Sequence, residues 1–355
     1  MSRMLDEIRE QPAALERTLR SERQTCQSLS RLIEARRPRL VLLAARGTSD
    51  NAAVFGRYLL EITTGIPVSL AAPSIFTLYG GASFDFRDTL VVALSQSGES
   101  TDTNLVAQRA REAGALTVGV TNEAGSALAQ IAEHVILVQA GREQSVAATK
   151  TYTGQLLTQY LLARCLGAPV PMDRLERLPE YAAKALELET AVAECAERYT
   201  YMNRAVSIAR GLNYANAFEF ALKLMETCYV VAERFSSADL LHGPIAMVES
   251  AFPAFLFAPA GVTWAGLRDM TDKLVQLGSE TLAITDRSNP EARRAAARSI
   301  CIESDLAESG SALPTEVWTP VPYIIPAQLF AAHLATHKRL DPDQPRTLSK
   351  VTRTL

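Results

Sequence analysis

The stretch RLVLLAARGTSDNAAVFGRYLLE, residues 39–61, has a counterpart in AVSIARGLNYANAFEFALKLME, residues 205–226. In both, an apolar run typical of a buried strand ends in Ala-Arg-Gly, and a helical pattern follows. Gly47 and Gly211 lie 164 positions apart, and the same spacing relates GALTVGVTN, which starts at Gly114, to GSETLAITD, which starts at Gly278. Two matches at one spacing indicate that the chain contains two copies of one α/β unit.

Within the first copy, apolar strands alternate with amphipathic helices. We predict strands at 39–45, 66–70, 89–94, 115–120 and 134–138, and helices at 50–63, 101–113 and 150–165. This alternation is typical of a parallel sheet covered on both faces. The expected fold class is therefore α/β, with two tandem flavodoxin-like three-layer sandwiches. The expected segments are an N-terminal helical segment at 1–38, a first domain at 39–170, a helical connector at 171–199, a second domain at 200–339 and a tail at 340–355.

The composition limits the class of protein. Of the 355 residues, 48% are hydrophobic and 21% are charged, as in ordinary globular proteins. The net charge is -3 and the basic residues are scattered, which argues against a nucleic-acid partner. The longest apolar run, 251–262, contains prolines and is too short to span a membrane. The charged, helical N-terminal stretch does not read as a signal peptide, so we expect a cytoplasmic location.

Neither the cysteines nor the histidines indicate a metal site. The five cysteines are widely spaced without a C-x-x-C pair, and we expect them to be reduced and mostly buried. His333 and His337 are four residues apart on a helical pattern, but no H-E-x-x-H arrangement supplies a carboxylate. We therefore predict no metal and no cofactor.

Hydroxyl side chains follow two of the predicted strands of the first copy. The stretch VVALSQSGESTDTN, 91–104, runs from a buried strand into Ser95, Ser97 and Ser100 around Gly98, and GTSD, 47–50, places Thr48 and Ser49 after another strand. Loops at the carboxyl ends of parallel strands lead into helix N-termini, where free N–H groups and the helix dipole attract anions. These loops predict a phosphate site. Neither a P-loop nor a G-x-G-x-x-G pattern is present, so nucleotide binding is disfavoured.

The second copy lacks this hydroxyl loop. The position 164 residues after Ser95 is Pro259, within FLFAPAGVT, and the next hydroxyl is Thr263. We therefore expect one phosphate site for each pair of copies, and another role for the second copy.

That role is indicated by NAFEFALKLMETCYVVAERF, 216–235, which reads as one mostly apolar helix. Glu219, Lys223 and Glu226 share one stripe of it, and such charges either pair with each other or line a polar cavity. Downstream, SSADLLHGPIAMV, 236–248, places His242 before Gly-Pro, on a predicted loop beside the helix. His242 is a candidate acid–base residue.

Several motifs together resemble one known family. ARGTSDNA, SQSGESTDT, VAATKTY, ALKLMET, SSADLLHGP and DPDQPRTLSKVT occur in this order and look like the double sugar-isomerase (SIS) domains of the isomerase half of glucosamine-6-phosphate synthase. No glutaminase domain precedes them in the sequence, so we expect a stand-alone relative rather than the synthase. VAATK, SSADLLHGP and the tail look most like the type II glucosamine-6-phosphate deaminases.

The resemblance implies roles for individual residues. It implies phosphate binding by Ser49, Ser95, Gln96, Ser97 and Ser100, and contact of the Val146 and Ala147 backbone with sugar hydroxyls. It implies proton transfer by Glu226 with Lys223 beside it, ring opening by His242, and a tail lysine, Lys350, at the sugar's carbonyl end. With the residues singled out from the pattern, the predicted substrate-binding set is Thr48, Ser49, Ser95, Gln96, Ser97, Gly98, Ser100, Val146, Ala147 and Glu219.

The implied activity is conversion of glucosamine 6-phosphate to fructose 6-phosphate and ammonia, without a cofactor. The family further implies a homodimer with composite active sites, to which His242 is contributed by the other subunit. The alternatives are an aldose–ketose phosphosugar isomerase, a ketosamine-6-phosphate deglycase and a non-catalytic phosphosugar sensor. Met225, Leu241 and Ala148 depart from the synthase pattern, so the gluco, galacto or ketosamine form of the sugar stays open.

Overall fold

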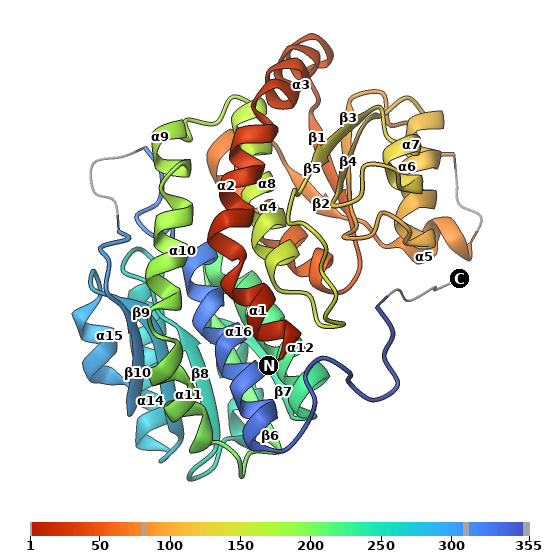
Figure 1. The fold of residues 1–355 in the computed structure, drawn as a ribbon. Helices are drawn as coiled ribbons and strands as arrows, with labels where there is room; N and C mark the ends of the chain where they lie inside the picture. The colour runs from red at the N-terminus through yellow and green to blue at the C-terminus, as the bar shows by residue number, and fades with distance from the viewer. Residues whose placement is uncertain (1, 80–82, 308–311, 351–355) are drawn as a thin grey trace. The chain divides into compact units, whose positions relative to one another are not determined.

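The computed structural model describes residues 2–79, 83–307 and 312–350. These residues group into two compact units (Figure 1). Unit 1 comprises the residues up to Pro12, Gln144–Thr149 and Arg177–Thr347, and unit 2 comprises Ala13–Glu143, Lys150–Glu176 and the tail from Leu348. The predicted domain bounds divide the chain more finely and stay a prediction. Residues 351–355 of the predicted tail lie outside the described residues.

Unit 2 contains a parallel five-stranded sheet in the order β2-β1-β3-β4-β5. Leu42 and Val91 pack with Phe76 and Val106 on one face of the sheet. Phe55 and Tyr160 join α4 to α8, and Figure 1 shows these two helices on the side of the sheet opposite α5 and α6. The strands are β1 (Leu40–Ala44), β2 (Val68–Leu70), β3 (Thr89–Leu94), β4 (Leu116–Thr121) and β5 (His134–Leu137). The helices are α2 (Gln11–Ser21), α3 (Arg23–Arg36), α4 (Thr48–Thr64), α5 (Pro73–Thr77), α6 (Thr101–Glu112), α7 (Ala127–Ile131), α8 (Lys150–Cys165) and α9 (Met172–Leu175).

Unit 1 repeats this arrangement, with a parallel sheet in the order β10-β9-β8-β6-β7. Leu256 packs with Met270 on one face, and Phe255 contacts the rings of Phe220 and Phe330 on the other. The strands are β6 (Arg204–Ala209), β7 (Val231–Ser236), β8 (Pro253–Phe257), β9 (Glu280–Asp286) and β10 (Arg298–Ile302). The helices are α1 (Arg3–Arg9), α10 (Leu178–Leu186), α11 (Glu189–Glu197), η1 (Gly211–Asn213), α12 (Tyr214–Cys228), α13 (Ser237–Leu241), η2 (Pro244–Met247), α14 (Trp264–Gln276), α15 (Pro290–Ala295) and α16 (Pro320–His337).

The two matching sheets confirm the predicted tandem α/β sandwiches. One element was predicted wrongly, because residues 216–235 do not form a single helix. Helix α12 ends at Cys228, Tyr229 adopts a left-handed conformation with φ 54°, and β7 follows. Val230 and Val231 are β-branched residues that favour strands, and the left-handed residue ends the helix before them. No helix among the described residues has the length and hydropathy needed to cross a membrane.

Candidate active site

The two predicted hydroxyl loops of unit 2 lie side by side. Strands β1 and β3 are hydrogen-bonded neighbours, so their carboxyl ends place residues 47–50 next to 95–100. An ion pair joins the segments that flank the two loops, since Nη2 of Arg46, just before the first loop, lies 2.7 Å from Oδ2 of Asp102 in the first turn of α6. Sequence reasoning missed both members of this pair, although Arg46 belongs to the repeated Ala-Arg-Gly.

The serine oxygens of these loops accept hydrogen bonds from within unit 2. Oγ of Ser95 accepts from the N–H of Gly98 at 3.1 Å, and Oγ of Ser97 accepts from the N–H of Glu99 at 3.2 Å. Oγ of Ser49 accepts from the side-chain amide of the buried Gln155 at 2.9 Å. A hydroxyl that accepts one bond still has its own proton to donate, which is what an anion requires.

The other predicted residues of these loops lie close by. Thr48 is the first residue of α4, Ser100 precedes α6, and its Oγ lies 3.1 Å from Oγ1 of Thr103. The carbonyl of Gln96 accepts from the N–H of Asn122 at 3.0 Å. The structure therefore brings Thr48, Ser49, Ser95, Gln96, Ser97, Gly98 and Ser100 to one edge of one sheet.

Gly98 is required by the shape of its loop. Its φ is 66°, and a Cβ at this position would lie 2.1 Å from Oγ of Ser126. Any side chain would therefore meet both backbone strain and a collision. The loop can therefore pack this closely against Ser126 only with glycine at position 98.

Helix α12 of unit 1 carries the predicted charged stripe. Nζ of Lys223 lies 3.4 Å from Oε1 of Glu219 and 2.5 Å from Oε2 of Glu226. The side chains of Lys223 and Glu219 are fully buried, while that of Glu226 is 23% exposed. The three charges pair with each other. Of the two carboxylates, that of Glu226 is the one that solvent or a ligand can reach.

The equivalent helix of unit 2 has no such charges. At the positions 164 residues earlier, α4 carries Phe55, Leu59 and Ile62. The fold can therefore be built with apolar side chains at these sites. Because burying charges costs free energy even when they are paired, the stripe of α12 is better explained by function than by stability.

His242 and the segment before α8 both belong to unit 1. His242 follows the short helix α13, which sequence reasoning missed, and its side chain is exposed. Val146 is half-buried and Ala147 is buried. Their segment is fixed because Glu7 accepts from the N–H groups of Gln144 and Ser145.

Lys350 in the tail pairs with a buried carboxylate of unit 2. Its Nζ lies 3.2 Å from Oε2 of Glu143, which also accepts from Oγ1 of Thr151 at 2.6 Å. Sequence reasoning missed Glu143, because a glutamate beside Gly141 and Arg142 reads as an exposed loop residue. A fixed carboxylate at this place positions the ammonium of the tail lysine.

The remaining histidines and cysteines form no recognisable centre. Nε2 of His333 lies 3.4 Å from Oε1 of Glu189, and His337 bonds to the carbonyl of Ala193. Among the described residues, no three metal-ligating side chains come together. All five cysteines are free: Cys165 and Cys228 are buried, and Cys26, Cys195 and Cys301 are half-buried.

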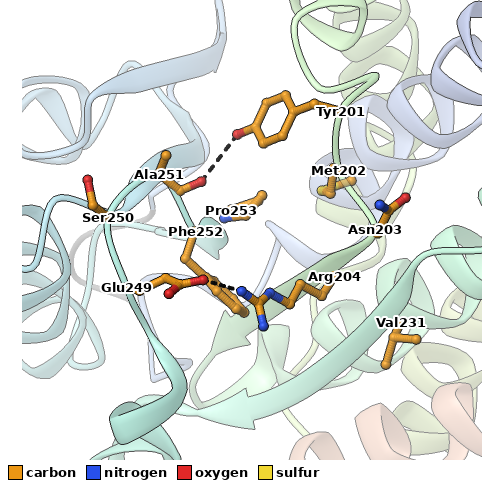
Figure 2. Close-up of a pocket in the computed structure, with 10 residues that line it drawn as sticks. All are labelled: Tyr201, Met202, Asn203, Arg204, Val231, Glu249, Ser250, Ala251, Phe252 and Pro253. Atoms are coloured by element: carbon orange, nitrogen blue, oxygen red, sulfur yellow. Dashed lines mark hydrogen bonds and ion pairs between the residues drawn. The ribbon is translucent and has the colours of Figure 1, made fainter.

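A cavity of about 770 Å³ in unit 1 lies away from these residues (Figure 2). Arg204 and Pro253, the first residues of β6 and β8, line it, so it lies at the amino ends of the strands. Figure 2 shows Arg204 paired with Glu249 across it. Ligands of doubly wound sheets bind at the carboxyl ends, so we do not assign this cavity to the substrate.

Comparison with known proteins identifies the family. The SIS domain model matches residues 33–164 and 200–338. The chain therefore belongs to the SIS domain family and contains two SIS domains in tandem. It is 35% identical to a glutamine–fructose-6-phosphate aminotransferase (isomerizing) of Methanothermobacter thermautotrophicus over 98% of this chain and 56% of that protein. The chain thus spans little more than half the length of this curated relative.

Two solved structures are similar over nearly the whole chain. One, from Silicibacter pomeroyi DSS-3, is provisionally assigned as a phosphosugar isomerase, with TM-score 0.84 and 31% identity, covering 97% of this chain and 100% of that one. The other is the C-terminal domain of the glucosamine-fructose-6-phosphate aminotransferase of Francisella tularensis, with TM-score 0.84 and 26% identity over 97% and 98% of the two chains. The predicted resemblance to the isomerase part of the synthase is confirmed.

Proposed function

We propose that the chain acts on a phosphorylated amino sugar, converting glucosamine 6-phosphate to fructose 6-phosphate and ammonia. The observation that carries this proposal is the Glu219–Lys223–Glu226 stripe, whose one accessible carboxylate is hydrogen-bonded to a buried ammonium. Its counterpart in α4 is apolar, so packing does not account for it. A carboxylate held in this way suits proton transfer between adjacent carbons.

In the proposed reaction, the loops at 47–50 and 95–100 bind the phosphate and His242 opens the sugar ring. Glu226 then removes the proton from C2 and returns it to C1 through an enolamine, which leaves an imine at C2. Water hydrolyses the imine to the ketose and releases ammonia. Lys223 stabilises developing negative charge, and Lys350 steadies the carbonyl end of the open sugar.

The direct test is to incubate the protein with glucosamine 6-phosphate and to measure ammonia and fructose 6-phosphate. Glu226→Gln is expected to lower turnover by about 10²- to 10⁴-fold, as loss of a general base does. Glu233→Gln, at an exposed position of strand β7, is the matched control and is expected to keep wild-type turnover. Absence of ammonia, together with equal behaviour of wild type and Glu226→Gln, would sink the deaminase proposal.

The same proton transfer also serves amination of fructose 6-phosphate by ammonia, which the names of the aminotransferase relatives favour. Fructose 6-phosphate and ammonium salts, followed by detection of glucosamine 6-phosphate, test this direction. Formation of a ketose phosphate without ammonia across a panel of sugar phosphates would instead indicate a simple isomerase. The homodimer stays a proposal, supported by the exposed His242 and tested by the molar mass in solution.

A further inference from the structure

The turn between β8 and α14 of unit 1 is the counterpart of the hydroxyl loop of unit 2. Residues 259–263 follow β8 as residues 95–99 follow β3, and α14 is a helix of 13 residues that begins at Trp264. The N–H groups of the first turn of such a helix lack partners within the helix, and its dipole attracts negative charge. The turn has therefore kept the backbone of an anion site although its serines are gone.

The carboxylate of Glu316 lies against this turn. Glu316 is only 2% exposed, and a Cβ at Gly261 would lie 2.2 Å from its Oε2. Burial raises the pKa of Glu316, and the N–H groups of Glu316 and Val262 offset part of that rise. The chain has thus placed a carboxylate, at some cost, against the backbone of the turn.

Unsatisfied oxygens gather at the same place. The Thr263 hydroxyl is near enough to favour the carboxylate form of Glu316, yet neither Oγ1 of Thr263 nor Oε2 of Glu316 makes a well-aligned hydrogen bond among the described residues. Oγ of Ser237, 3.9 Å from where a Cβ of Gly266 would lie, is also buried without such a bond. Such atoms also occur elsewhere among the described residues, but here those of Thr263 and Glu316 lie at one turn and that of Ser237 lies beside the first turn of α14, which marks the turn as a candidate ligand-binding turn.

The surroundings of the turn follow the plan of the first sequence copy. A Cβ at Gly211 would lie 3.0 Å from Cγ2 of Thr263, so the loop after β6 meets the turn after β8. Glu316 precedes the first residue of α16 by four positions, as Val146 precedes that of α8. The carboxylate therefore comes from the position that, in the first copy, is predicted to meet the substrate.

We propose that the β8–α14 turn is a phosphate-class anion site that the chain fills with its own Glu316 carboxylate, which excludes phosphate from unit 1. A phosphoryl group is the ligand class because the turn has the strand–turn–helix form that binds phosphate through backbone N–H groups. The first copy thus keeps the phosphate site, and the second keeps the same turn closed. This inference concerns unit 1 alone and does not depend on the proposed reaction.

The test is to count phosphate sites. Wild type, Glu316→Ala and Glu316→Gln are titrated with inorganic phosphate by calorimetry at pH 7, after circular dichroism has established that each is folded. Glu316→Ala is expected to bind one more phosphate per chain than wild type, whatever the wild-type number is. Glu316→Gln fills the same volume and is expected to bind the wild-type number.

A second variant locates the added site. Thr263→Val in the Glu316→Ala background removes a hydroxyl from the turn, and the added phosphate is expected to bind at least about tenfold more weakly. A folded Glu316→Ala with the wild-type number of sites would overturn the proposal. Added binding that Thr263→Val leaves unchanged would overturn it too, because the phosphate would then lie elsewhere. Glu316→Ser replaces the alanine variant if the latter does not fold.

Discussion

The two copies of the α/β unit differ most at two places, and in opposite directions. After the third strand of each sheet, unit 2 has Ser95 and Ser97 where unit 1 has Pro259 and Gly261. On the helix after the first strand, unit 1 has buried charges where unit 2 has apolar residues. Since each feature is absent from one copy, the fold requires neither of them. The comparison therefore supports the proposal that one copy binds the anion and the other carries the acid–base chemistry.

The largest effect is expected from breaking the charged stripe of α12. Lys223→Met removes the ammonium and leaves the fully buried Glu219 and the partly buried Glu226 without their cation. Removal of one partner from a buried ion pair typically costs about 3–5 kcal/mol, because the remaining charge has no compensation. Urea unfolding at pH 7 measures this loss.

The comparison with α4 supplies the control for that loss. The triple variant Glu219→Met, Lys223→Leu, Glu226→Ile makes α12 apolar like its counterpart, in which Phe55 and Leu59 are fully buried. Its free energy of unfolding is expected to return to within about 1–2 kcal/mol of wild type, because well-packed apolar residues can replace buried charges. A triple variant as unstable as Lys223→Met would show that the second copy needs its charges to fold.

A smaller effect is expected at the repeated arginine. Arg46 pairs with the buried Asp102. Its counterpart Arg210 is exposed and makes no ion pair among the described residues, because Gly266 stands at the position that corresponds to Asp102. Arg46→Met is expected to cost about 1 kcal/mol, since half of the Arg46 side chain is exposed and solvent screens the pair. Arg210→Met is expected to change the free energy of unfolding by less than about 0.5 kcal/mol. Equal losses at the two arginines would contradict the difference between the copies.

The fold could be predicted because its central strands are recognisable from their local sequence alone. Buried parallel strands such as β3 and β4 are apolar throughout, and their repetition at one spacing identified the two copies. The edge strand β7 was missed because Glu233 and Arg234 make it polar, and it follows a helix of similar composition. Its place in the sheet comes from pairing with β6, which local sequence does not contain.

The candidate site was predictable only in part, for a similar reason. Hydroxyls after strands and charges on one helical stripe are local patterns. Glu143 and Glu316 act through residues that are remote in sequence, as the Glu143–Lys350 ion pair shows across 207 positions. Nothing near either glutamate in the chain distinguishes it from an exposed one. Burial within a particular fold is what makes these carboxylates notable.

The smallest effect is expected in how the free energy of unfolding depends on pH, which tests whether Glu316 is charged in the β8–α14 turn of unit 1. Burial raises the pKa of Glu316 above its ordinary value of 4.5, and no charged side chain contributes to that shift. Between the unfolded and folded pKa values the native state therefore holds a proton that the unfolded chain has lost. The stability contributed by this proton is complete below pH 4.5 and is lost as the pH rises through the folded pKa.

The glutamine of Glu316→Gln is uncharged at every pH, so this variant does not lose stability as the pH rises through the pKa of Glu316. Its free energy of unfolding, minus that of wild type, is expected to increase with pH above about 4.5 and then to level off. Urea unfolding of both proteins between pH 4 and 8 measures the difference, and other groups such as Asp286, whose pKa is also raised by burial, cancel because both proteins contain them. If the difference does not change with pH, the pKa of Glu316 is the same in the folded and the unfolded protein. The turn of unit 1 would then not hold a costly internal anion, and the contrast with the hydroxyl loop of unit 2 would rest on its missing serines alone.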